Sequence, residues 1–104
     1  MSKGTLLIIG AGKHQVELIK KSVLLGYHTL AIDNDPNAEG FNYCDERLIQ
    51  STYNYIEIID ALKRLDKIEK VCGVITQAAH GCIPTVSKIS KYLGLSHLNS
   101  KTAE

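Results

Sequence analysis

Two glycines between an apolar run and a helical pattern are the first candidates for chemistry. Gly10 and Gly12 follow the apolar residues 6–9, and Lys13 and His14 come directly after them. A glycine turn between a strand and a helix exposes backbone N–H groups and the positive end of the helix dipole, and both favour anions. Because glycine has no Cβ, a ligand can approach this backbone closely. The stretch therefore predicts a site for a phosphate or a carboxylate, with a plain strand–helix turn as the alternative.

The same turn partly fits the G-x-G-x-x-G/A pattern of dinucleotide-binding proteins. Gly10 and Gly12 occupy the first two places, but Gln15 stands where a third small residue would let the helix pack closely on the strand. Asp33 lies near the distance expected for an acid that binds a ribose, although turns also favour aspartate. NAD or another nucleotide is therefore an alternative ligand, and not the first expectation.

Two histidines and one cysteine add weaker candidates. His14 and His80 fall in predicted loops and could exchange protons or bind an anion, although most loop histidines are solvated or bonded to backbone. Cys82 lies near an expected helix start, which lowers a thiol pKa, but we interpret it as inert. No Ser-His-Asp arrangement, Walker A sequence or metal-ligand spacing appears. We therefore assign no catalytic residue and no metal ligand.

An α/β fold is the framework that these residues require. Short apolar runs predict strands at 6–9, 29–32, 46–50 and 71–76, with a further strand at 96–98, and helical periodicity predicts helices at 13–25, 55–65 and 82–93. This alternation predicts a Rossmann-like, three-layer α/β/α domain whose mostly parallel sheet has four to five strands. Right-handed crossovers give the strand order 3-2-1-4-5.

The predicted order reverses between the first and the fourth strand. Ligands of open α/β sheets bind at such a point, beyond the carboxyl ends of the strands. The loops at 10–15 and 76–81 flank this crevice, and Asp33 lies at its rim. The topology thus leads to the same turn that the glycines indicate.

Composition excludes several classes of function. The 104 residues are enough for one domain, and the net charge of +1 would attract neither nucleic acid nor a membrane surface. The chain has no apolar stretch of signal-peptide or membrane-spanning length. Its three cysteines have no paired spacing, and we expect Cys72 to be a small core residue. These features predict a reduced, cytoplasmic protein.

Several segments, taken in order, resemble a known family. They are LLIIGAGKHQ (6–15), LGY (25–27), AIDNDPNAEG (31–40), YCD (43–45), GVIT (73–76), IPTV (83–86), YLGL (92–95) and NSKTAE (99–104). The set is similar to the N-terminal, pre-ATP-grasp domain of ATP-grasp ligases. Among these, carbamoyl-phosphate synthase large-chain-like and biotin-carboxylase-like members look most alike. The resemblance covers residues 1–104 as a single domain.

This resemblance implies a role in an ATP-dependent ligase that works through an acyl phosphate. The parent protein would need ATP and Mg²⁺, which bind downstream, so we expect no cofactor and no turnover in these 104 residues alone. The implied partners are the downstream ATP-grasp domain and a small carboxylate or phosphate substrate. The substrate-binding residues that the resemblance implies are Gly10, Gly12, Lys13, His14 and Gln15 on one side and Thr76, Gln77, Ala78 and His80 on the other. The predicted topology adds Asp33 at the rim.

Two other functions stay open at this point. One is a nucleotide-binding or dinucleotide-binding Rossmann module, which rests on Gly10, Gly12 and Asp33. The other is a non-catalytic interaction domain, including one that forms a homodimer. The sequence offers no apolar stripe that would identify an interface.

Overall fold

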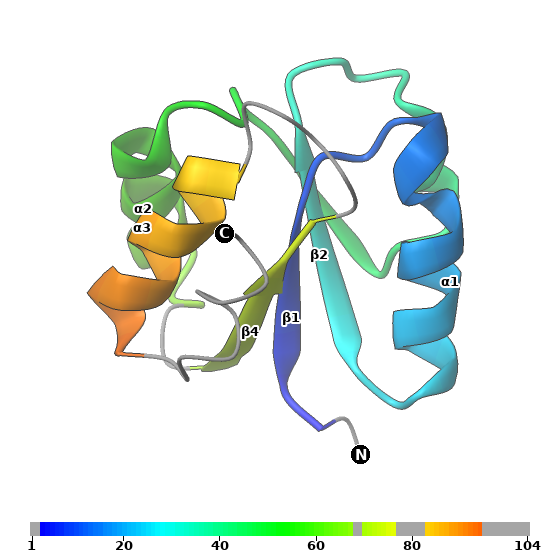
Figure 1. The fold of residues 1–104 in the computed structure, drawn as a ribbon, viewed down its shortest axis with the longest axis horizontal. Coiled ribbons are helices and arrows are strands. Elements are labelled where there is room, and N and C mark those ends of the chain that lie inside the picture. Colours follow the sequence, from blue (N-terminus) through cyan, green and yellow to red (C-terminus); the bar gives the residue numbers. More distant parts are fainter. Residues whose placement is uncertain (1–2, 68–69, 77–82, 95–104) are drawn as a thin grey trace.

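A four-stranded parallel sheet with helices on both faces forms the framework (Figure 1). The computed structural model describes residues 3–67, 70–76 and 83–94. Its elements are β1 (Thr5–Ile9), η1 (Lys13–Gln15), α1 (Val16–Leu24), β2 (His28–Asp33), η2 (Glu39–Asn42), β3 (Glu46–Ile49), α2 (Tyr55–Arg64), β4 (Val71–Ile75) and α3 (Ile83–Leu93). Strands and helices thus alternate, as their hydrophobic periodicity predicts.

The strand order is β3-β2-β1-β4, and all three strand pairs are parallel. This confirms the predicted order and the reversal beside β1, which lies between β2 and β4. The charged strand β3 lies at an edge, where its side chains reach water. The fifth strand expected at 96–98 lies outside the described residues.

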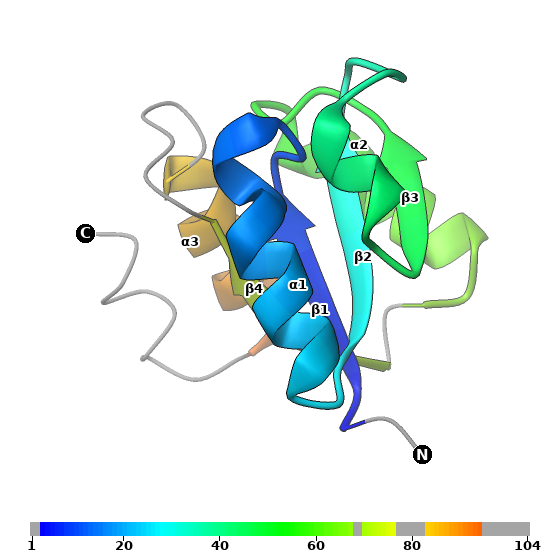
Figure 2. The same ribbon diagram turned by 90° about the vertical axis from the view of Figure 1, so that its right-hand side faces the viewer.

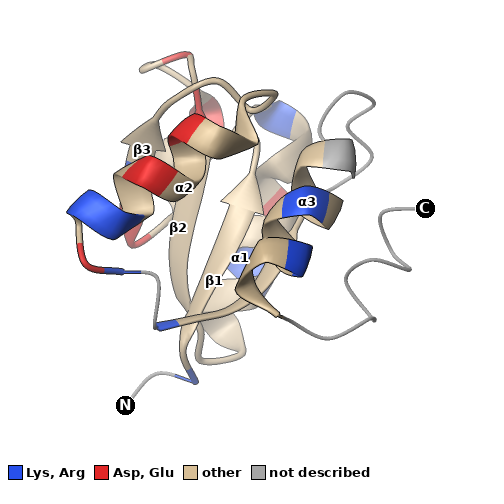
Figure 3. Cartoon of the chain, turned by 90° about the vertical axis from the view of Figure 1, so that its left-hand side faces the viewer, with Lys and Arg blue, Asp and Glu red and all other residues tan. Residues whose placement is uncertain are grey.

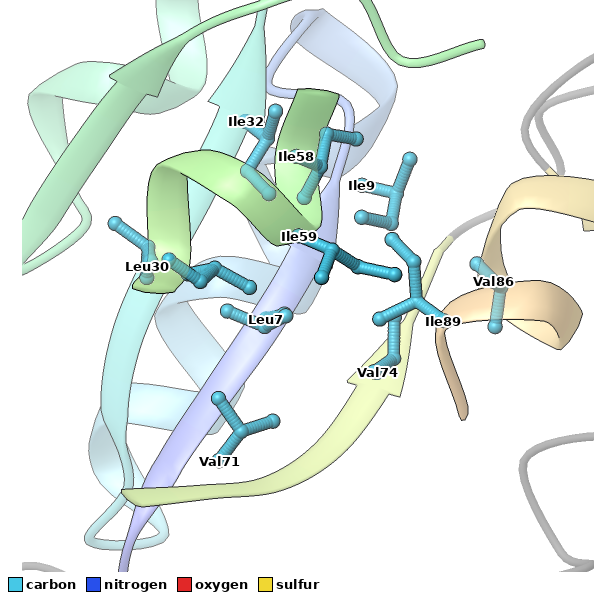
Figure 4. Packing of buried hydrophobic residues seen from close by; sticks show 11 residues of the cluster. Leu7, Ile9, Leu30, Ile32, Ile58, Ile59, Val71, Val74, Val86 and Ile89 are labelled. Carbon is cyan, nitrogen blue, oxygen red and sulfur yellow. The ribbon is translucent and has the colours of Figure 1, made fainter. Parts of the chain in front are cut away.

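Both faces of β1 are covered, which explains its unbroken apolar sequence. Leu7 and Ile9 pack under α2 and α3, in the cluster drawn in Figure 4. Ile8 points to the other face, where it meets Ile19 of α1 and Phe41 of η2. Figures 2 and 3 show these two helical layers from opposite sides. The three-layer arrangement is therefore the predicted one.

Local sequence features set the ends of the helices. Gly26 adopts a φ of +96°, and the N–H groups of Gly26 and Tyr27 donate to the carbonyls of Val23 and Ser22, closing α1 in a Schellman motif. The Asn54 side chain accepts a hydrogen bond of 3.2 Å from the Glu57 N–H and caps α2. Gly26 thus ends α1, and Asn54 begins α2.

The core assignment of Cys72 is wrong. Cys72 is exposed, because α2 and α3 cover only the other face of β4, and α1 lies over β1 and β2. Its side chain lines an open groove with Leu6, Leu18 and Ile75. Leu65 is also 50% exposed, because α2 ends at Arg64 and the chain turns away.

Candidate functional site

The glycine loop joins the end of β1 to the start of η1. Gly10 has a φ of +100°, a conformation that favours glycine, and its N–H donates a hydrogen bond of 2.7 Å to the Ile32 carbonyl of β2. Gly12 has extended backbone, and a Cβ built on it would meet no atom of the described residues within 4 Å. Gly10 is therefore needed for the turn itself, whereas Gly12 leaves open space above the loop.

Three consecutive N–H groups follow this turn. In the described part of the chain, the N–H groups of Gly12, Lys13 and His14 have no hydrogen-bond acceptor, whereas the Gln15 N–H donates to the Gly12 carbonyl. Such N–H groups are the unsatisfied donors of a helix start, next to the positive end of its dipole. The side chains of Lys13 and His14 are exposed beside them. This geometry can bind an anion.

Asp33 holds the loop from the end of β2. Its Oδ2 accepts a hydrogen bond of 2.9 Å from the Ala11 N–H, and its Oδ1 accepts one of 3.0 Å from the Asp35 N–H. Asp35 repeats the turn by accepting from the Asn37 N–H. These are the Asx turns and backbone caps that aspartates favour in loops. A direct contact of Asp33 with a ligand stays a prediction.

Gln15 and Thr76 connect the two sides of the crevice. The Nε2 group of Gln15 lies 3.4 Å from Oγ1 of Thr76, and that hydroxyl donates a hydrogen bond of 2.7 Å to the Ile9 carbonyl. Gln15 is only 4% exposed. The structure thus brings together the glycine loop and Thr76, and their binding of a substrate stays a prediction. Gln77 and His80 lie outside the described residues, and their assignment to the site stays a prediction.

Gly40 supports the same loop and was missed by the sequence analysis. Its N–H donates a hydrogen bond of 2.6 Å to the Ala11 carbonyl, and a Cβ on Gly40 would lie 2.5 Å from that oxygen. Only glycine allows this approach without a shift of the backbone. The signal available was a glycine late in the loop after the second strand, a strand that had to lie next to the first.

A cluster of charged side chains lies at the amino ends of the strands, opposite the glycine loop. Lys67 Nζ lies 2.8 Å from Oε1 of Glu46, and His28 Nε2 lies 3.4 Å from the same oxygen. The hydrogen bond from Lys67, followed by that from His28, holds the pKa of Glu46 below its ordinary value. This cluster ties the amino ends of β2 and β3 together. His28 thus has a structural role in this cluster.

Two classes of site find no support in the described part of the chain. There, no group of three or more His, Cys, Asp and Glu side chains could hold a metal ion. None of the described helices is long and apolar enough to span a bilayer.

Comparisons with known proteins find similar folds among solved synthetases. No protein-family model matches the chain, and no curated protein sequence matches it significantly. Phosphoribosylglycinamide synthetase from Anaerococcus prevotii matches at 30% identity with a TM-score of 0.77, over 89% of this chain and 23% of that one. N5-carboxyaminoimidazole ribonucleotide synthetase from Thermotoga maritima matches at 16% identity with a TM-score of 0.65, over 86% of this chain and 23% of that one. The corresponding synthetase from Staphylococcus aureus, complexed with ADP, matches at 14% identity with a TM-score of 0.68, over 90% and 24%.

The chain spans about a quarter of the length of these solved ligases. The two matches at 14% and 16% identity show a common fold, and the match at 30% adds a likeness of sequence. The narrower assignment to carbamoyl-phosphate-synthase-like or biotin-carboxylase-like members stays a prediction. The family resemblance itself is confirmed: the chain corresponds to the N-terminal domain of an ATP-grasp ligase.

Proposed function

We propose that this chain is the acceptor-binding domain of an ATP-dependent ligase, and that its glycine loop holds the carboxylate or phosphate of the substrate. The observation that carries the proposal is the row of three N–H groups at Gly12, Lys13 and His14, which lack an acceptor in the described part of the chain. They stand at the switch point of the sheet, where ligands of open α/β folds bind. The partner is the downstream ATP-grasp domain.

The work of this domain is to bind and orient. The N–H groups of Gly12 and its two neighbours donate hydrogen bonds to the anion, and the Lys13 ammonium adds charge from an exposed position. Asp33 and Gly40 keep the loop in this conformation by fixing both backbone groups of Ala11. A loop that is already ordered loses less entropy on binding. ATP and Mg²⁺ supply the phosphorylation of a carboxylate elsewhere in the parent protein.

Calorimetric titration of the 104-residue chain with inorganic phosphate, at constant ionic strength, tests the proposal. We expect saturable binding in the millimolar range, about tenfold weaker in Lys13→Ala, because a charge-assisted contact is lost. The matched control is Lys91→Ala, which removes an exposed lysine from α3 and should leave the affinity unchanged. An equal loss of affinity in the two variants would show that the effect comes from net charge alone. If the chain shows no saturable binding of phosphate, the site is refuted.

The chain by itself should not hydrolyse ATP, because the proposed ATP and Mg²⁺ sites belong to the downstream part. Hydrolysis that co-purifies with the chain and disappears in a Gly12 variant would contradict this.

The size of the native protein tests whether this chain is part of a larger parent protein. An immunoblot of the source cell with an antibody to this domain should detect a band several-fold larger than 104 residues. A band of the size of this chain would favour a separate binding module. A cytoplasmic location stays a prediction.

The competing functions make different predictions. A dinucleotide-binding module would bind NAD saturably and lose it in Asp33→Ala. The two N–H groups already bonded to this carboxylate argue for a supporting role instead. An interaction domain that forms a homodimer would sediment faster as its concentration rises. A constant monomeric sedimentation coefficient would remove that alternative.

A further inference from the structure

A buried glutamine stands where dinucleotide-binding turns carry glycine or alanine. Gln15 is 4% exposed, although glutamine is normally a surface residue. In the G-x-G-x-x-G/A pattern, the third small residue lets the helix pack closely on the strand and leaves the pyrophosphate on the helix start. Gln15 therefore changes the shape of the site at a defined position.

The Gln15 side chain lies between the glycine loop and the sheet. Its Nε2 atom lies 3.2 Å from the point that a Cβ on Gly10 would occupy, and its Cδ and Cγ atoms lie 3.5 Å from it. From there the amide reaches Thr76, at the end of β4, over 3.4 Å. The side chain thus crosses from the carboxyl end of β1 to that of β4.

The Thr76 hydroxyl secures this bridge. It donates a hydrogen bond of 2.7 Å to the Ile9 carbonyl and accepts one of 3.4 Å from the Gln15 amide. The bridge therefore joins the carboxyl ends of β1 and β4 beside the glycine loop. Above it, the open positions of the loop are Gly12, where a Cβ would meet no atom of the described residues within 4 Å, and the exposed Lys13 and His14.

We infer that Gln15 is a specificity-determining residue that restricts the glycine loop to a single anionic group and excludes the pyrophosphate of a dinucleotide. The inference rests on the proposed function and names the substrate class: a monophosphate or a carboxylate. A second phosphoryl group would need the space beside Gly10 that the Gln15 side chain occupies. The neutral amide there is already bonded to Thr76 and offers no charge to compensate.

The test compares inorganic phosphate with inorganic pyrophosphate, each titrated calorimetrically into the 104-residue chain at constant ionic strength. The readout is the ratio of the two dissociation constants, because a loss of folded protein lowers both affinities and leaves their ratio unchanged. In Gln15→Ala the ratio should shift by about tenfold toward pyrophosphate, the effect of one added charge-assisted contact. Gln15→Leu keeps the volume without the amide, so its ratio should stay close to that of the parent chain.

An unchanged ratio in Gln15→Ala, or an equal shift in Gln15→Leu, would overturn the inference. The proposed function would still stand as long as the chain binds phosphate. If Gln15→Ala does not fold, Gln15→Ser decides the question, because it also shortens the side chain but keeps a polar group. A shift toward pyrophosphate in Gln15→Ser supports the inference, and none refutes it. If the unmodified chain binds neither anion, the proposed function fails first.

Discussion

The Ala11 N–H donates a hydrogen bond of 2.9 Å to Oδ2 of Asp33, and this bond joins the glycine loop after β1 to the end of β2. Ala11 has no exposed surface, so water cannot replace the carboxylate. On its other side, the Ala11 carbonyl accepts the Gly40 N–H. The loop is therefore fixed by two neighbouring segments before any ligand arrives, and its conformation can be tested without a substrate.

Replacing Asp33 with alanine should destabilise the domain by about 1–3 kcal/mol, because it leaves the buried Ala11 N–H without an acceptor. Asp33→Asn keeps one carbonyl oxygen as an acceptor and should therefore lose less stability. Urea unfolding followed by circular dichroism measures both. An Asp33→Ala chain as stable as the parent would show that this hydrogen bond contributes nothing to the fold.

Gly40 and Gly12 form a matched pair for the steric argument. A Cβ on Gly40 would lie 2.5 Å from the Ala11 oxygen and 2.7 Å from Cδ1 of Ile19, so Gly40→Ala should cost about 1–3 kcal/mol in unfolding free energy. Gly12→Ala places its methyl group in open space and should change stability by less than about 0.5 kcal/mol. The same methyl group stands over the loop and should weaken phosphate binding. Equal destabilisation by the two substitutions would contradict the packing described here.

Sequence reasoning reached the fold because its signals are local. The apolar runs around Leu7 and Leu30 and the caps at Gly26 and Asn54 act within a few residues, and chain connectivity then determines the strand order. The support of the site depends on contacts distant in sequence. Asp33 meets Ala11 across 22 residues, and Gln15 meets Thr76 across 61. Composition and periodicity contain no record of such contacts, which explains why the role of Gly40 and the contact of Gln15 with Thr76 escaped prediction.

Acid should weaken the cluster of Lys67, Glu46 and His28 at the amino ends of the strands. The Lys67 hydrogen bond, with a smaller contribution from His28, lowers the pKa of Glu46 below its ordinary value of 4.5, so its stabilising effect is complete above that pH. The effect is lost as the pH falls through the lower pKa of the folded state. Because Glu46 is 32% exposed, the pair should contribute below about 1 kcal/mol.

The comparison of Lys67→Met with Lys70→Met isolates this pair. Lys70 lines the same pocket but makes no ion pair in the described part of the chain. Chemical unfolding should show a deficit for Lys67→Met at pH 6 that shrinks below pH 4.5, and none for Lys70→Met. A deficit for Lys67→Met that persists at low pH would point to lost packing instead.

The cysteines should differ in reactivity. Cys72 is exposed in the groove beside α1, whereas Cys44 is half-buried and its Sγ lies 3.6 Å from the Phe41 carbonyl. Burial raises the pKa of the Cys44 thiol, which lowers its thiolate fraction at neutral pH. Iodoacetamide should therefore label Cys72 several-fold faster, as followed by peptide mass spectrometry. Faster labelling of Cys44 would place Cys72 under a covering segment.

The most direct test of the central claim is a ¹H–¹⁵N NMR titration of the 104-residue chain with inorganic phosphate at constant ionic strength. The account predicts saturable shifts that are largest at the amides of Gly12, Lys13 and His14, because these N–H groups would donate to the anion. The amide signals of Glu46 and Lys67, in the cluster at the amino ends of the strands, should shift little. Shifts that do not saturate, or that centre on Glu46 and Lys67, would contradict an acceptor site on the glycine loop.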